Sequence, residues 1–189
     1  MTRRVLFLEN QDSFSWNVVD RLPFERSQVR LVPGAGATAA LLDGCDALVI
    51  GPGPMDPVRA GLLPVVHAAM ERRLPTLGIC LGHQAIGLAL GARLARAHPA
   101  HGRVSVVTFT PSRLFPGFRG PVPVMRYHSL ALESVVAPLC VVARTEDGVV
   151  MAVEHATLPL AGVQFHPDSF GTPRGEELLR SFFEAVSCA

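Results

Sequence analysis

The stretch of the chain that decides its fold and its chemistry is Pro75-Thr76-Leu77-Gly78-Ile79-Cys80-Leu81-Gly82-His83-Gln84. Its first half predicts a short apolar strand, and its second half begins a helix that continues through Leu90. A glycine two residues before Cys80 and another two residues after it are typical of a sharp strand–turn–helix that lifts a nucleophile above a sheet. At such a turn the sulfur lies at a helix N-terminus, where free N–H groups and the helix dipole favour the thiolate. Because free cysteines are often ordinary core residues, a nucleophilic Cys80 also requires a base from elsewhere in the chain.

Apolar runs and helical patterns alternate around this stretch. Runs without polar alternation predict buried strands at residues 5–8, 28–32, 47–50 and 76–79. Helical patterns lie between them at residues 14–22, 39–42 and 62–72. This alternation of strands and helices predicts a parallel α/β sheet with helices on both faces.

The pattern changes after the helix that follows Cys80. Five β-rich segments separated by turns are predicted at residues 104–109, 122–127, 140–145, 149–153 and 160–165. Glu146-Asp147-Gly148 is a hairpin signal between two of them, and an amphipathic helix is predicted over residues 176–186. We therefore expect residues 1–189 to form a single α/β domain. Its open, mostly parallel sheet would carry helices on both faces and an antiparallel β extension.

Composition limits the kinds of partner and the compartment. The 189 residues carry a formal net charge of +1 with 17% charged side chains, which does not indicate a surface for nucleic acid or acidic membranes. The N-terminal apolar run is too short for a signal peptide, and no stretch approaches membrane-spanning length. The four cysteines are Cys45, Cys80, Cys140 and Cys188, and no two of them form a CxxC pair. We therefore expect reduced thiols and a cytoplasmic protein. The hydrophobic fraction of 49% fits a sheet buried on both faces or a large partner interface.

The leading candidate for the base is His166. It ends an apolar strand, where doubly wound sheets place their sites, and Asp168 could fix the imidazole tautomer. His83 competes because it lies three residues after Cys80 on one helix, although a base usually comes from another segment. A metal site at Cys80 and His83 lacks a second ligand pair with suitable spacing. His128 ends a predicted strand and could shape a pocket. The other histidines are expected to be surface or structural residues: His67, His98, His101 and His155.

The loop Gly51-Pro52-Gly53-Pro54 follows the third predicted strand. Loops at the carboxyl ends of neighbouring parallel strands converge, so this loop could border Cys80. Its glycines would allow a backbone N–H to face a ligand, as an oxyanion hole requires, but a rigid turn explains the pattern equally well. No phosphate loop or dinucleotide fingerprint is present, because Gly34-Ala35-Gly36 does not complete the required pattern.

Several motifs, in order along the chain, resemble those of one family. Gly78-Ile79-Cys80-Leu81-Gly82-His83-Gln84 and the downstream Gly162-Val163-Gln164-Phe165-His166-Pro167 are similar to the class I (triad) glutamine amidotransferases. Within that family the chain resembles the amidotransferase subunits of anthranilate synthase and aminodeoxychorismate synthase. The other matching motifs are Glu9-Asn10-Gln11-Asp12-Ser13-Phe14, Pro52-Gly53-Pro54, His101-Gly102-Arg103, Arg126-Tyr127-His128-Ser129-Leu130 and Glu146-Asp147-Gly148. The resemblance covers nearly the whole chain.

The resemblance implies a triad of Cys80, His166 and Asp168. Cys80 would attack the side-chain amide of glutamine, and His166 would relay the proton to the departing ammonia. A γ-glutamyl thioester would form and then be hydrolysed to glutamate. Further matched positions would hold the oxyanion through backbone N–H groups (Gly53 and Leu81) or bind the glutamine (Gln84, Ser129 and Leu130). Ammonia would pass to a separate synthase subunit that aminates chorismate, and this chain would need no metal or cofactor, since the Mg²⁺ belongs to the partner.

Two positions depart from the family pattern. The family normally has Glu after His-Pro, and Asp168 is one methylene shorter, a loss of reach of roughly 1.5 Å, so we expect a slower glutaminase. Met55 replaces the last glycine of Pro-Gly-Pro-Gly and would be strained if that position needs a positive φ. Arg59 stands where an acid is common. The alternatives are a stand-alone γ-glutamyl hydrolase and a catalytically weakened scaffold subunit. The sequence does not separate the tryptophan pathway from the folate pathway.

Overall fold

The computed structural model describes residues 3–187, with every side chain in that range except those of His98 and His101. The expectations that concern Cys188 and those two histidine side chains therefore lie outside the described residues. No helix in the described range is long and apolar enough to cross a membrane.

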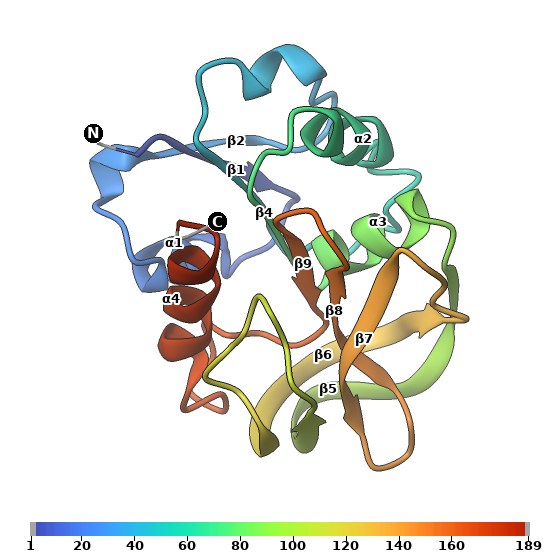
Figure 1. The fold of residues 1–189 in the computed structure, drawn as a ribbon. Coiled ribbons are helices and arrows are strands. Elements are labelled where there is room, and N and C mark those ends of the chain that lie inside the picture. The colour runs from blue at the N-terminus through green and yellow to red at the C-terminus, as the bar shows by residue number, and fades with distance from the viewer. Residues whose placement is uncertain (1–2, 188–189) are drawn as a thin grey trace.

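The described residues form one nine-stranded sheet in the order β2-β1-β3-β4-β9-β8-β7-β5-β6 (Figure 1). Its parallel half consists of β2 (Val29–Pro33), β1 (Val5–Glu9), β3 (Ala47–Ile50), β4 (Thr76–Ile79) and β9 (Leu160–Val163). These short strands are almost uninterrupted apolar runs, as is typical of strands covered on both faces. They agree closely with the ranges expected from the sequence.

Four antiparallel strands extend the sheet beyond β9. They are β8 (Val150–His155), β7 (Leu139–Thr145), β5 (Arg93–Phe109) and β6 (Gly120–Glu133). The predicted hairpin joins β7 to β8, where the Gly148 N–H donates to the Thr145 carbonyl at 3.0 Å. The predicted lengths of β5 and β6 were too short. Irregularities in their pairing, between Arg96 and Ala100 and between His101 and Arg103, break the two-residue alternation that marks a strand in sequence.

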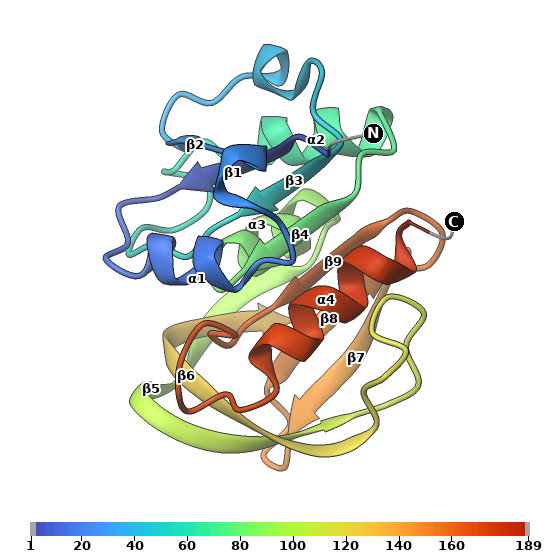
Figure 2. The ribbon, with the colours of Figure 1, turned by 90° about the vertical axis from the view of Figure 1, so that its left-hand side faces the viewer.

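Helices cover both faces of the sheet, as predicted (Figure 2). On one face lie α2 (Leu63–Glu71) and α3 (Leu81–Ala89), and on the other lie α1 (Ser15–Arg21) and α4 (Gly175–Ala185). Two short 3₁₀ turns, η1 (Arg26–Gln28) and η2 (Ala39–Leu42), lie in the connections. Side chains along β1 alternate between the two cores: Val5 and Phe7 pack with α1 and α4, and Leu6 and Leu8 pack with α2 and α3.

The order of the parallel strands determines where a site can form. β4 pairs with β3 on one side and with β9 on the other, and Gly78 lies opposite Gly162. The segments that follow β1, β3, β4 and β9 therefore meet at one edge of the sheet. Open α/β sheets bind their ligands at this edge.

Candidate active site

Cys80 occupies a sharp turn between β4 and α3. Its backbone has φ 51° and ψ −97°, a conformation that residues other than glycine rarely adopt. The turn is held on both sides, because the Cys80 N–H donates to the Val163 carbonyl at 2.8 Å and the Gln84 N–H donates to the Cys80 carbonyl at 3.1 Å. The predicted strand–turn–helix is confirmed, and its strained residue is the cysteine itself.

The two flanking glycines let the backbone segments of this turn approach each other closely. A Cβ atom at Gly82 would lie 2.2 Å from the Ile50 carbonyl oxygen, at the end of β3. A Cβ atom at Gly78 would lie 2.4 Å from the backbone of Gly82. Any side chain at either position would push α3 away from the sheet, so the spacing of glycines around Cys80 has a steric cause.

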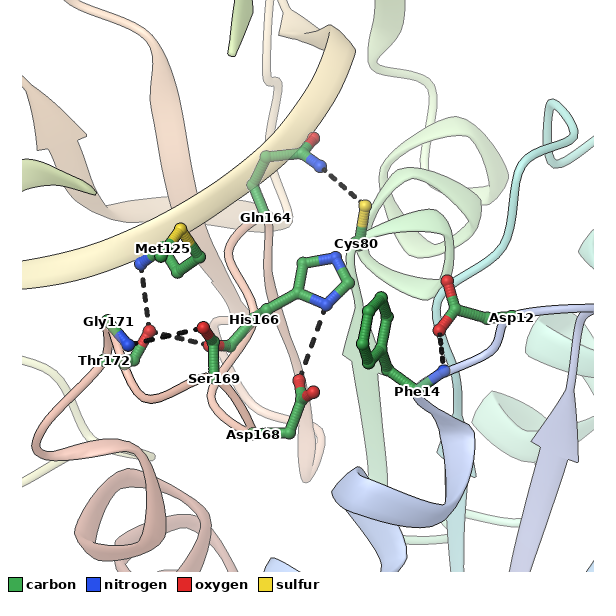
Figure 3. A network of polar contacts seen from close by, with 10 residues as sticks. All are labelled: Asp12, Phe14, Cys80, Met125, Gln164, His166, Asp168, Ser169, Gly171 and Thr172. Atoms are coloured by element: carbon green, nitrogen blue, oxygen red, sulfur yellow. Dashed lines mark hydrogen bonds and ion pairs between the residues drawn. The ribbon is translucent and has the colours of Figure 1, made fainter. Parts of the chain in front are cut away.

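His166 faces Cys80 from the segment that follows β9. Figure 3 shows its ring between the Cys80 sulfur and the Asp168 carboxylate. The Nδ1 atom lies 3.4 Å from Asp168 Oδ1, and both side chains are almost fully buried. Charged hydrogen bonds are usually about 2.7–2.9 Å long, and Asp168 Oδ1 has no hydrogen bond within the described residues. The short aspartate side chain thus pairs with the ring without closing fully onto it.

The charges around His166 change its protonation. Burial has the largest single influence on the pKa of His166 and would lower it. The contacts and charges of Asp168 and Cys80 together outweigh burial and raise the pKa from 6.5 to about 10. His166 therefore presents an imidazolium to the sulfur at neutral pH, and a neighbouring imidazolium favours the thiolate form of a cysteine.

The titration of His166 tests this arrangement. We expect its ring resonances in a ¹³C-labelled chain to titrate near pH 10, and Asp168→Asn to lower the pKa because it removes a negative charge.

Because the folded pKa is raised, the stabilisation from the protonated ring is complete below pH 6.5 and is lost as the pH rises through about 10. The free energy of unfolding should therefore fall more steeply from pH 7 to 10 in the parent than in Asp168→Asn. A ring that titrates near 6.5 in both proteins would contradict the charge pairing.

The backbone of His166 is clamped by residues that the sequence analysis did not identify. Its N–H donates to the Met125 carbonyl at 3.0 Å, and its carbonyl accepts from Thr172 Oγ1 at 2.7 Å. The same Thr172 hydroxyl accepts from the Met125 N–H at 2.9 Å, and Figure 3 shows Thr172 between Met125 and His166. The Tyr127 ring packs edge-on against the imidazole, with ring centroids 5.0 Å apart. Nothing in the local sequence around Thr172 signals this contact, since its partner lies on a distant strand.

Removal of the Thr172 hydroxyl should loosen His166. We expect Thr172→Val, which has nearly the same shape, to lower the free energy of unfolding by about 2 kcal/mol, because it leaves a buried N–H and a buried carbonyl unpaired. Thr172→Ser keeps the hydroxyl and should stay within about 1 kcal/mol of the parent, the cost of one lost methyl group. Chemical denaturation measures both. Equal stabilities for the two variants would show that the hydroxyl does not hold the loop.

A pocket of about 410 Å³ opens above Cys80. Its walls come from the segments that follow β1 and β3, from the turn at Cys80, from β6 and from His166: residues 11–14, 52–55, 80, 84, 127–130 and 166. Both polar and apolar groups line it. This is the size and character of a site for a small polar molecule.

Six of the eight predicted site residues line this pocket: Gly53, Cys80, Gln84, Ser129, Leu130 and His166. Leu81 begins α3, and its side chain packs in the core. A Cβ atom at Gly53 would lie 2.8 Å from Leu81 Cδ2, so the loop after β3 rests directly against the cysteine turn. Asp168 lies behind His166 and lines a smaller cavity of about 120 Å³ with Phe14 and Tyr127.

Met55 lines the pocket without the expected strain. It is not among the residues of the described chain that have a positive φ, and its half-buried side chain packs against the core beneath α2 and α3. The loop therefore accommodates a side chain at this position. Arg59 pairs with Asp56 at 3.4 Å on the surface.

Four of the remaining histidines have described side chains. His83 is fully buried and does not line the pocket; burial lowers its pKa to about 3, against a backbone contact with Gly162, so it is neutral. His128 lines the pocket, but it lies within β6 and not at the end of a strand, where it had been expected. His67 is exposed, and buried His155 accepts two backbone N–H groups at 3.1 and 2.9 Å. Among the side chains that the structure describes, which leave out His98 and His101, no group of three or more from His, Cys, Asp and Glu could hold a metal ion.

Comparison with known proteins shows the family of this chain. The chain belongs to the class-I glutamine amidotransferase family, whose model, "Glutamine amidotransferase class-I", matches residues 6–186. Anthranilate synthase component 2 of Azospirillum brasilense is 38% identical over 96% of this chain and 96% of its own length. Aminodeoxychorismate synthase component 2 of Escherichia coli (strain K12) is 37% identical over 94% of this chain and 98% of its own length. The resemblance expected from the motifs is confirmed.

Two further similarities differ in extent. An aminodeoxychorismate synthase of Streptomyces griseus is 45% identical over 95% of this chain, but the chain spans only 25% of that protein's length. A solved structure from Thermoplasma acidophilum, described as one subunit of a GMP synthase, matches with a TM-score of 0.87 at 24% identity, over 100% of this chain and 96% of that one. The second similarity confirms the fold.

Proposed function

We propose that this chain is the glutaminase subunit of a chorismate-aminating synthase. The observation that carries the proposal is the meeting of Cys80 and His166 in one pocket, on a fold whose family is the glutamine amidotransferases. The Cys80 thiolate attacks the side-chain amide carbon of glutamine and forms a tetrahedral oxyanion. Collapse of this species breaks the C–N bond, and His166 gives its proton to the departing nitrogen. Ammonia leaves, and a γ-glutamyl thioester remains on Cys80.

The second half of the reaction returns the site to its starting state. Neutral His166 takes a proton from water as the water oxygen attacks the thioester carbon. The C–S bond breaks, glutamate is released, and the thiolate again faces an imidazolium. The backbone N–H groups of Gly53 and Leu81 hold the oxyanion in both halves. Gln84, Ser129 and Leu130 bind the glutamine in the pocket.

The partner in this proposal is a synthase subunit that binds chorismate. The proposal is supported by the printed names of relatives of matching length, which are component 2 of anthranilate or aminodeoxychorismate synthases. Any Mg²⁺ belongs to that partner, and this chain uses no cofactor. A third relative, from Bacillus subtilis (strain 168), is named for both synthases, so the names support either product.

Product identification tests the proposal directly. The chain is purified together with its synthase partner and given chorismate with glutamine or with ammonium chloride. Mass spectrometry then distinguishes anthranilate from 4-amino-4-deoxychorismate. We expect one of these products with either nitrogen source. A complex that makes product from ammonium but never from glutamine would contradict the proposal.

The 3.4 Å separation at Asp168 favours one competing function, a weakened subunit that only supports its partner. An electrophilic glutamine analogue separates the two. We expect the diazoketone 6-diazo-5-oxo-norleucine to label Cys80 in the assembled complex, and a complete absence of labelling would favour the scaffold. A stand-alone hydrolase would instead show the same glutaminase rate with and without the partner.

Asp168→Glu should raise the rate of glutamine hydrolysis. The added methylene supplies the reach that Asp168 lacks, so the carboxylate can form a full hydrogen bond to the ring of His166. We expect kcat to rise about three- to tenfold, which corresponds to about 1 kcal/mol of better orientation. Steady-state glutaminase assays of the complex measure this, with Asp168→Asn as the control that should be slower than the parent. A glutamate variant no faster than the parent would show that orientation is already complete.

A further inference from the structure

Gln164 is a fully buried residue next to Cys80 that has no role in the mechanism proposed above. It lies between the end of β9 and His166, and its backbone N–H donates to the Met151 carbonyl at 2.9 Å. Gln164 is not among the residues that line the pocket. Its side chain instead points at the Cys80 sulfur, with the amide nitrogen 3.6 Å from Sγ (Figure 3).

The backbone carbonyl of Leu130 makes it possible to assign the donor in the hydrogen bond between Gln164 and Cys80. The Leu130 carbonyl can only accept, and it receives Gln84 Nε2 at 3.1 Å and the His128 Nδ1–H at 2.9 Å. The tautomer of His128 is fixed in turn, since Arg126 donates to its Nε2 at 3.1 Å. The amide nitrogen of Gln84 is therefore the group that faces Leu130.

The amide nitrogen of Gln84 also fixes the orientation of the Gln164 side-chain amide. Gln84 Nε2 also donates to Gln164 Oε1 at 3.1 Å, so the other end of the Gln164 amide, its NH₂ group, faces the sulfur. Gln164 can consequently only donate to Cys80. An amide cannot take up the thiol proton, so this bond favours the charged sulfur without competing with His166 as the base.

We propose that Gln164 is a positioning residue that holds the Cys80 sulfur charged and aimed before glutamine arrives. This inference rests on the proposed glutaminase function. The hydrogen bond is strongest to the thiolate, weaker to the thioester sulfur, and strong again as the thiolate leaves during hydrolysis. Gln164 thus stabilises both the attacking group of the first step and the leaving group of the second. Among the described titratable side chains around this sulfur, His166 is charged and pairs with Asp168, His128 lines the same pocket, and buried His83 is neutral.

Two variants of Gln164 distinguish the effect of its N–H donor from the effect of its side-chain shape. Gln164→Met keeps the length and volume but removes both hydrogen bonds. Gln164→Glu keeps an acceptor for Gln84 and replaces the donor with a negative charge. The matched control is Gln28→Met, because Gln28 lies on η1 and does not line the pocket. Melting temperatures establish that each protein is folded.

The decisive readout is alkylation of Cys80 by iodoacetamide as a function of pH, followed at the Cys80 peptide by mass spectrometry. Loss of one hydrogen bond to a charged group should move the pH midpoint of alkylation up by about one unit in Gln164→Met, so alkylation should be roughly tenfold slower than in the parent at pH values below the parental midpoint. Gln164→Glu should be slower still, and Gln28→Met should match the parent. A folded Gln164→Met with the parental pH profile would overturn the proposal.

Glutamine kinetics of the complex add a second readout. We expect kcat of Gln164→Met to fall roughly tenfold with KM within about twofold of the parent, because Gln164 does not line the pocket. A raised KM with unchanged kcat would overturn the positioning role and assign Gln164 to substrate binding. The alkylation readout needs no turnover. Failure of the parent complex to hydrolyse glutamine would therefore contradict the proposed function alone and leave the result at Gln164 readable.

Discussion

We expect Cys80→Ala to abolish glutamine-dependent product formation while ammonium-dependent formation persists. The sulfur is the nucleophile of the proposed mechanism, and removal of a nucleophile from a catalytic triad lowers the rate by a factor of about 1,000 or more. In the proposed complex ammonium bypasses this subunit, because the amination itself is assigned to the partner. The measurement uses the assembled complex with chorismate and either nitrogen source, and it follows product by fluorescence or mass spectrometry.

The control for this experiment is Cys140→Ala. Cys140 is an exposed free cysteine on β7 that does not line the pocket, so its loss should leave both activities unchanged. Glutamine-dependent turnover that survives in Cys80→Ala would show that another group is the nucleophile. Loss of both activities in Cys80→Ala would show instead that the complex fails to assemble, and size-exclusion chromatography of the variant complex checks this.

Gly82→Ala is expected to have the largest effect on stability. The new Cβ atom would lie 2.2 Å from the Ile50 carbonyl oxygen, a contact that only a shift of the backbone can relieve. Because α3 and β3 both belong to the core, we expect the free energy of unfolding to fall by about 3 kcal/mol. Glutaminase activity should fall as well, since the shift moves Cys80 relative to His166. Denaturation with urea measures the first effect.

Gly117→Ala is the matched control for the glycine at the turn. A Cβ atom at Gly117 would meet only Glu177 Oε1, at 3.9 Å, which is an ordinary contact. Gly117→Ala should therefore keep the parental free energy of unfolding to within about 0.5 kcal/mol. Equal stabilities for the two alanine variants would show that α3 can move away from β3 at little cost.

The parallel half of the sheet and the cysteine turn were predictable because their signals are local. Each of these strands is a short apolar run, and the two glycines around Cys80 lie within one turn of it. The full length of strand β5 was not predictable, because its pairing with β6 shifts twice between Arg96 and Arg103. These shifts hide the alternation of buried and exposed side chains. A period of two residues is visible in sequence only while the pairing stays in register.

The site divides in the same way. Cys80 and His166 could be named from their motifs, and all but two of the predicted residues line the pocket. A long distance between Asp168 and His166 could be expected, since the aspartate lacks one methylene. Its value of 3.4 Å depends on how the loop after β9 is held. Gln164 and Thr172 form hydrogen bonds with residues on distant segments, Cys80 and Met125, so no pattern of neighbouring residues could reveal these contacts.

The insertion of β9 between β4 and β8 has a consequence for the growing chain. The ribosome releases Cys80 long before residues 160–166, so a nascent chain carries the thiol but lacks the histidine opposite it. Until β9 enters, β4 is an open edge with unpaired N–H and carbonyl groups, which invites pairing with other chains. The strand that closes this edge also brings His166, the proposed base. Protection from aggregation and the onset of thiol reactivity should therefore arrive together, late in synthesis.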